Sequence, residues 1–183
     1  MQTLFDDADS RTSCQIQYRA MTVSDLPAAA AIEATVEDGW SESGILGALE
    51  SSAARCFVAV ALPCGAQAAC AQNEPPHSPV ATGVICGFCA CSLVCDTANL
   101  DAVSVAQTYR RRGIARGLLS FAAEALHRAG AQTLWLEVRS QNTPARALYG
   151  ALGFTQNGLR RGFYTKPNDD AVLMEKRLFG PLL

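Results

Sequence analysis

The 183-residue chain has few of the features that mark membrane or secreted proteins. It contains no apolar run near the ~20 residues that a membrane-spanning helix needs. Its first thirteen residues, MQTLFDDADSRTS, are acidic and lack the basic-then-apolar layout of a signal peptide. Only two residues are histidine, and we interpret His77 as a loop residue and His127 as a helix-surface residue. We therefore expect a cytoplasmic protein without a membrane partner and without a catalytic histidine.

Eight cysteines are present, but their positions do not suggest a disulfide framework. Cys86, Cys89 and Cys91 lie inside an apolar, strand-like run. In one extended strand Cys86 would point away from Cys89 and Cys91, so these residues and Cys95 could not surround a zinc ion without a break in the strand. We expect reduced, mostly buried thiols and no metal.

Charge is balanced overall but unevenly distributed. The formal net charge is only −2, with twelve acids and three bases in residues 1–101 but five acids and twelve bases in residues 102–183. A basic half suits a polyanionic ligand. The arginines cluster at one turn without interleaved aromatic residues, so direct binding of nucleic acid is not expected.

The pattern of apolar residues predicts one domain built around a mixed sheet. Residues 1–14 are interpreted as a loose tail and 15–183 as the domain, with a long proline- and alanine-rich connection at about 63–81. The expected fold class is α/β (an α+β mixed sheet) with about seven strands and about four helices. The predicted order is one strand, two helices, three strands, a helix, a strand, a helix and two strands.

Apolar periodicity and capping residues give approximate bounds for these elements. The strands are expected at 16–19, 56–62, 82–94, 100–105, 132–139, 155–161 and 171–178. The helices are expected at 25–37, about 41–50, 114–128 and 143–152. Ser41 is expected to cap the second helix, and Thr143 and Pro144 to be the N-cap and first residue of the last. The apolar face predicted for that last helix consists of Ala147, Leu148, Ala151 and Leu152.

The most informative stretch is 104–130, in which a strand passes through three arginines into an amphipathic helix. Free backbone N–H groups and the positive end of the helix dipole make such a helix N-terminus a site for anions. Gly113 and the small Ala115 let a phosphate approach the backbone closely. This turn is therefore predicted to bind a phosphate-containing ligand.

The same turn carries a family resemblance. Its pattern Arg110-x-x-Gly113-x-Ala115 resembles the acyl-CoA signature, Gln/Arg-x-x-Gly-x-Gly/Ala, of the GNAT superfamily of N-acetyltransferases. Residues 134–154, LWLEVRSQNTPARALYGALGF, resemble the ribosomal-protein alanine N-acetyltransferase (RimI-type) branch. The Trp-Ser-Glu at 40–42 also fits, although Gly39 stands where the branch usually has proline. The resemblance covers about residues 16–178.

The resemblance implies a GNAT-like acyl-CoA N-acyltransferase fold, with acetyl-CoA as cosubstrate and no metal. It implies Glu137 as the general base and Tyr149 as the general acid, and it places Trp40 and Tyr164 beside the acceptor peptide. The residues expected to contact the cosubstrate are Val103, Ser104, Val105, Arg111, Arg112, Gly113, Ile114, Ala115, Arg116 and Asn142.

Spacing alone leaves simpler interpretations open for four of these residues. Glu137 could be an ion-paired residue at a strand end, and Tyr149 a helix-face residue with its hydroxyl in water. Asn142 could cap the helix that follows it, with or without a cofactor contact. Tyr164 could be an aromatic residue of the sheet.

The resulting hypothesis is an acetyl-CoA-dependent N-acetyltransferase that acts on a protein N-terminus. Its expected substrate is the N-terminal alanine of the eighteenth small-subunit ribosomal protein, and family members of this type are often monomers. An α-amine has a pKa of ~7.7–8.0, so a modest base suffices to neutralise it. The alternatives are an acetyltransferase for another protein N-terminus, a lysine or a small amine, and a non-catalytic acyl-CoA-binding module.

Overall fold

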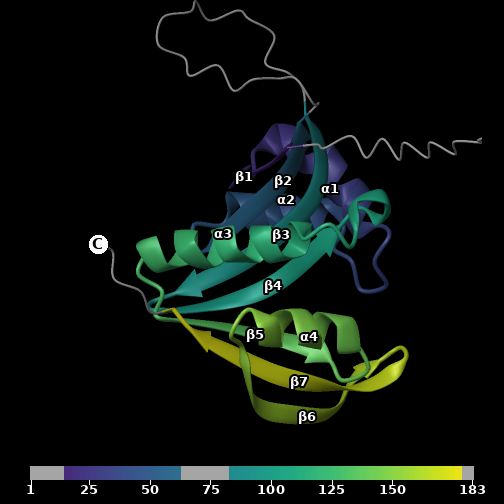
Figure 1. The fold of residues 1–183 in the computed structure, drawn as a ribbon, viewed down its shortest axis with the longest axis vertical. Helices are drawn as coiled ribbons and strands as arrows, with labels where there is room; N and C mark the ends of the chain where they lie inside the picture. The colour runs from purple at the N-terminus through teal and green to yellow at the C-terminus, as the bar shows by residue number, and fades with distance from the viewer. Residues whose placement is uncertain (1–14, 63–82, 179–183) are drawn as a thin grey trace, which may run out of the picture.

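A computed structural model describes residues 15–62 and 83–178, and within them one seven-stranded mixed sheet is covered by four α-helices (Figure 1). The strands are β1 (Gln15–Ala20), β2 (Ala54–Leu62), β3 (Val84–Val94), β4 (Thr97–Val105), β5 (Thr133–Arg139), β6 (Thr155–Thr165) and β7 (Asn168–Arg177). The helices are α1 (Leu26–Glu33), α2 (Glu42–Glu50), α3 (Ile114–Arg128) and α4 (Thr143–Ala151). The predicted tail and the connection at 63–81 lie outside the described residues.

The spatial order of the strands is β1-β2-β3-β4-β5-β7-β6. All neighbours are antiparallel except β4 and β5, which are joined by a crossover through α3 and run parallel. The predicted fold class and order of elements are confirmed. None of the helices in the described ranges is long and apolar enough to cross a membrane.

Each face of the sheet packs against its own pair of helices. Along β2, Phe57 and Ala59 belong to the core cluster under α3 and α4, whereas Val58 and Val60 belong to the cluster under α1 and α2. Figure 1 shows α3 and α4 together on the near face. A strand buried on both faces reads as a continuous apolar run, which explains the sequence CFVAVAL at 56–62.

The first α-helix, α1, is shorter than predicted. A capping box links Thr22 and Asp25, and α1 then ends at Glu33 rather than at residue 37. The chain turns back over the helix end, because Gly39 packs directly on the Glu33 carbonyl and a Cβ there would lie 2.0 Å from that oxygen. Its N–H donates to the carbonyl of Val36 (3.1 Å). The prediction missed this turn because helical spacing continues through it.

The start of α4 also differs from the prediction. Asn142, and not Thr143, is the N-cap: its side-chain oxygen accepts a hydrogen bond from the N–H of Ala145 (3.1 Å). The prediction of Ser41 as a cap is confirmed, since its hydroxyl accepts from the N–H of Gly44 (3.2 Å). The alternative interpretation of Asn142 as a helix cap is therefore correct, and its contact with a cofactor stays a prediction.

The buried face of α4 is rotated relative to the prediction. Ala147 and Ala151 are exposed, whereas Leu148 and Leu152 pack partly against the core and Tyr149 is the most buried residue of the helix. The two alanines gave a misleading apolar stripe. The helix instead turns its tyrosine toward the sheet, where the ring meets Phe154 edge-on at 5.7 Å.

The cysteines of β3 share one side of the sheet, contrary to the prediction. The register with β2 shifts at Ala59, which leaves Cys86 as an extra residue in a bulge. Cys86, Cys89 and Cys91 all belong to the same core cluster, and Cys86 donates to the carbonyl of Ala59 (3.3 Å). No group of three metal-ligating side chains suited to an ion occurs within residues 15–62 and 83–178.

Candidate active site

The candidate site begins where β4 and β5 part. Their parallel pairing runs only from Thr97 with Thr133 to Leu100 with Leu136, and beyond it the strands separate toward their carboxyl ends (Figure 1). The last residues of β4 pair with β3 on one side and leave their other side open. Ala106 donates its N–H to β3, so the alternation of a strand turns the N–H of Val105 toward the opening.

The predicted cofactor residues of β4 lie along this opening. Val103 is partly buried, while Ser104 and Val105 are buried. Ser104 has a contact that the sequence did not reveal: its hydroxyl donates to the carboxylate of Glu33, a buried residue of α1. Open backbone groups on a strand edge can hold an extended ligand by strand-like hydrogen bonds.

The predicted anion-binding turn has the conformation that close approach to its amides requires. Arg111 and Gly113 have left-handed φ angles of 64° and 78°. Gly117 is the first residue whose N–H bonds back within α3, to the Gly113 carbonyl (3.0 Å), so the N–H groups before it have no intrahelical acceptor. Ile114 as a whole is only 2% exposed and belongs to the core cluster under α3, so its side chain is not available to a ligand.

The arginines of the turn make different contacts. Arg110 turns back from the loop and donates its Nε–H to the carbonyl of Val105 (3.0 Å), which ties the loop to the end of β4. Arg112 lies over the ring of Tyr109, 5.4 Å from its centroid. Within the described residues, none of the ion pairs involves Arg111, Arg112 or Arg116, all of which are exposed. Their positive charge is available to an anionic ligand.

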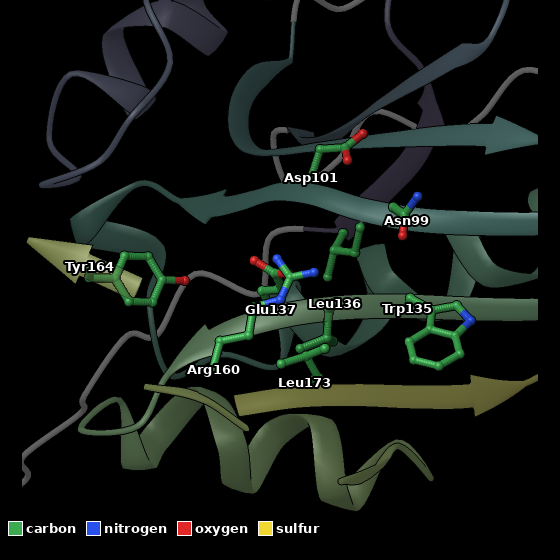
Figure 2. A pocket seen from close by; sticks show the side chains of 9 residues that line it. Asn99, Asp101, Trp135, Leu136, Glu137, Arg160, Tyr164 and Leu173 are labelled. Atoms are coloured by element: carbon green, nitrogen blue, oxygen red, sulfur yellow. The ribbon is translucent and has the colours of Figure 1, made fainter. Parts of the chain in front are cut away.

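On the face of the sheet opposite α3 and α4, a pocket of about 540 Å³ lies over the splayed strands (Figure 2). Its lining residues come from β4, β5, β6 and β7 and are Asn99, Leu100, Asp101, Trp135, Leu136, Glu137, Arg160, Tyr164 and Leu173. The pocket therefore contains the predicted base Glu137 and the predicted peptide-contacting Tyr164.

Glu137 forms an ion pair with Arg160, at 2.7 Å between carboxylate and guanidinium. The pair forms because β5 and β6 both flank β7, which brings the two side chains to one face of the sheet. The Glu137 side chain is 33% exposed, so the pair remains open to the pocket. The hydroxyl of Tyr164 points toward this pair (Figure 2), and burial followed by the nearby Glu137 charge raises the pKa of Tyr164.

Tyr149 approaches from the α4 side. The residue is 6% exposed, and burial, then the neighbouring Cys89 and Tyr164, raise the pKa of its phenol well above the usual range. Within the described ranges, every side-chain oxygen that is fully shielded from solvent has a hydrogen-bond partner. The Tyr149 hydroxyl forms no hydrogen bond with the described residues, so it is not fully shielded. That hydroxyl therefore keeps contact with solvent while its ring is in the core.

Arg139, at the end of β5, joins two loops beside the pocket. It donates to Asp38 through Nε (3.0 Å) and Nη2 (2.6 Å), and to the carbonyls of Lys166 and Pro167 (both 3.0 Å). Its guanidinium also lies 4.1 Å from the ring centroid of Tyr164. The loop that follows α1 and the turn between β6 and β7 are thus held together over the end of β5.

Four side chains of this site were not predicted from the sequence. Glu33, Asp38, Arg139 and Arg160 are charged, and apart from Trp40, which lies seven positions after Glu33, their partners lie 23 to 101 positions away in the chain. Single charged residues in a sequence carry no signal of such pairing. Trp40, predicted to contact the peptide, is partly buried against the core under α1 and α2. Its backbone N–H donates to the carboxylate of Glu33 (2.8 Å).

Comparisons with known proteins agree with this geometry. The sequence profile of the Acetyltransferase (GNAT) family matches residues 47–154. The chain is 39% identical over 94 residues to the [ribosomal protein bS18]-alanine N-acetyltransferase of Escherichia coli K12, covering 50% of this chain and 64% of that enzyme. It is 40% identical over 93 residues to the enzyme of that name from Haemophilus influenzae, covering 49% and 63%. The matches thus span less than two thirds of these relatives.

Solved structures extend the likeness over most of the chain. The crystal structure of the ribosomal-protein-S18-alanine N-acetyltransferase from Escherichia coli superposes with a TM-score of 0.71 at 29% identity, covering 92% of this chain and 99% of that one. NAA60 of Arabidopsis thaliana, solved in complex with acetyl-CoA, gives 0.72 at 18% identity, covering 91% and 100%. With its family profile matched over more than half its length and its splayed mixed sheet, this chain belongs to the Acetyltransferase (GNAT) family.

Proposed function

We propose that this protein transfers an acetyl group from acetyl-CoA to the N-terminal α-amine of a protein, and that the acceptor is the N-terminal alanine of ribosomal protein bS18. The observation that carries the proposal is the splay of β4 and β5, with the anion-binding turn on one side and Glu137 on the other. The bS18-acetylating enzymes to which the chain is similar supply the choice of acceptor. We propose that the protein acts as a monomer in the cytoplasm.

The residues of the donor side fit the parts of acetyl-CoA. The N–H groups at 112–116 and the guanidinium groups that form no ion pair within the described residues suit its pyrophosphate. The open edge at Val103–Val105 suits the amide-bearing pantetheine arm, which would add to β4 like a strand. This arrangement would bring the thioester to the point where β4 and β5 separate.

The transfer requires the protein to stabilise one developing charge, to accept one proton and to donate another. When the amine nitrogen attacks the thioester carbon, a C–N bond forms and negative charge builds on the carbonyl oxygen, which the inward N–H of Val105 would stabilise. The amine must lose one proton, which the Glu137 carboxylate would accept directly or through a water. The C–S bond then breaks, and the sulfur of CoA gains a proton from Tyr149.

The environment of Tyr149 suits this last step. Because burial raises the pKa of its phenol, the proton stays on the hydroxyl throughout the physiological pH range. The leaving thiolate would form beside this largely buried ring, where partial loss of hydration would increase its own affinity for a proton. The hydroxyl, which keeps contact with solvent, would be accessible to the sulfur while the ring stays packed against Phe154.

The test is acetyl transfer from acetyl-CoA to a short peptide with the bS18 N-terminus, read by thiol release and by mass. A peptide with a blocked α-amine and a free lysine is the matched control. We expect transfer to the free N-terminus alone. Transfer to neither peptide by folded, CoA-binding protein would refute the proposal and favour a non-catalytic acyl-CoA-binding module.

A further inference from the structure

We propose that Glu33 is a positioning residue of this site: its buried carboxylate holds the 34–41 turn against the end of β4 and so sets where the acceptor lies relative to the acetyl donor. The proposal rests on the proposed function. Glu33 is 2% exposed, although glutamate is rarely buried unless its charge is paired or hydrogen-bonded. Its buried place therefore calls for a physical reason.

The two oxygens of this carboxylate have different partners. Oε2 accepts the backbone N–H of Trp40 (2.8 Å), and Oε1 accepts the hydroxyl of Ser104. Trp40 directly precedes the Ser41 cap of α2, so one bond fixes the end of the turn and the start of the next helix. The other bond reaches 71 positions along the chain to the penultimate residue of β4.

These partners belong to the two halves of the candidate site. The turn held by Trp40 also contains Asp38, which pairs with Arg139 beside the pocket that holds Glu137. Ser104 lies between Val103 and Val105 on the open edge of β4, where the acetyl donor is expected. The hydrogen bonds of Glu33 link this turn directly to that edge. Acceptor side and donor side thus meet at Glu33.

The chemistry of Glu33 predicts which substitutions should matter. Glu33→Ala removes both acceptors and leaves a buried N–H and a buried hydroxyl without partners. Glu33→Gln keeps an oxygen for Trp40, and its NH₂ can donate to Ser104, whose hydroxyl can also accept. Ser104→Ala removes only the bond to β4. We expect the size of the defect to fall in the order Glu33→Ala, Ser104→Ala, Glu33→Gln.

The experiment combines steady-state kinetics with hydrogen–deuterium exchange on the full chain. For Glu33→Ala we expect the peptide KM to rise by about tenfold to a hundredfold, since small misplacements of reactants have effects of that size. The acetyl-CoA KM should stay within about twofold, because the donor-binding backbone is untouched. Amide exchange should accelerate in 34–41 and not in α3.

Controls separate positioning from stability and from the proposed function. Ile32→Val shortens a core side chain of the same helix, so it should lower the melting temperature without changing the peptide KM. If Glu33→Ala does not fold, Ser104→Ala carries the same test. Unchanged peptide KM and unchanged exchange in 34–41 would overturn the proposal. A wild-type protein without turnover would refute the proposed function, and exchange in 34–41 would still report on Glu33.

Discussion

The two sides of the candidate site differ in the groups that form them: backbone on one side and side chains on the other. The proposed donor side consists mainly of backbone groups from two neighbouring stretches, the end of β4 and the turn at 111–113. The proposed acceptor side consists of side chains from β4, β5, β6 and β7 and the turn after α1, joined by ion pairs. The first is a local conformation, and the second depends on how distant strands align. The comparison predicts that the two sides respond to different substitutions.

The largest effect is expected for the two residues proposed to transfer protons. Glu137→Gln and Tyr149→Phe should each lower kcat by about 10²–10⁴-fold, because each removes one proton transfer. Affinity for CoA should not change, since neither residue belongs to the anion-binding turn. Thiol release measures the first quantity and calorimetry the second. Near-normal turnover of both variants would contradict their assigned roles.

On the donor side, Gly113→Val should weaken acetyl-CoA binding by about fivefold to thirtyfold, the equivalent of 1–2 kcal/mol of left-handed strain. A Cβ at Gly113 meets nothing within 4 Å, so the expected effect comes from its φ of 78° alone. Gly130→Val is the matched control, because Gly130 has a φ of 101° beyond the far end of α3. It should lower the melting temperature and leave the acetyl-CoA KM unchanged; an equal rise in both variants would show a general stability effect.

On the acceptor side, Asp38→Asn should raise the peptide KM by about twofold to fivefold without changing the acetyl-CoA KM, the range of a partly exposed ion pair. Asp38 is 56% exposed and its partner Arg139 only 16%. The difference from wild type should shrink at high salt. Glu37→Gln is the control, since Glu37 acts on Arg139 only through space. A larger effect from Glu37→Gln would show that net charge, and not this bond, matters.

The smallest effect on turnover is expected for the anchor of α1, which should instead change stability with pH. Arg19, followed by smaller contributions, lowers the pKa of Asp25 from 3.8 to about 2. The resulting stabilisation is fully present above pH 3.8 and is lost as the pH falls through 2. Because Arg19 is 37% exposed, solvent screening reduces the contribution to about 1–2 kcal/mol.

Urea unfolding at pH 7 and pH 2 measures this contribution. Asp25→Asn should destabilise the protein at pH 7 and have little effect at pH 2. The surface pair of Glu124 and Arg128, whose side chains are 67% and 54% exposed, supplies the control. Glu124→Gln should change stability little at either pH, and a pH-independent loss in Asp25→Asn would show that the charge is not the cause.

The helix and the turn of the proposed donor side could be predicted from the sequence, and their contact with acetyl-CoA stays a prediction. The helix of residues 114–128 and the turn before it follow from local spacing, an N-terminal glycine and a run of arginines. The burial of Tyr149 could not, because Ala147 and Ala151 produced an equally apolar stripe on α4. Propensity alone does not choose between two faces of a short helix; packing against Phe154 does.

On the proposed acceptor side, the partners of the predicted residues could not be predicted from the sequence. Glu137, Tyr164 and Trp40 were named through a family resemblance, but their partners Arg160, Arg139 and Glu33 were not. These partners depend on the register of β5 and β6 with β7 and on where α1 ends. A one-residue change of register would turn each of these strand side chains to the other face.

The sequence by itself determined the order of elements and the turn before α3, because each depends on residues within a few positions of one another. The mixed sheet could be predicted from that order of strands and helices. The tertiary structure alone decided the bulge at Cys86, the end of α1 at Glu33 and the charge pairs around the pocket. Those features arise when strands distant in sequence align and bury polar groups, which must then find partners in the folded chain.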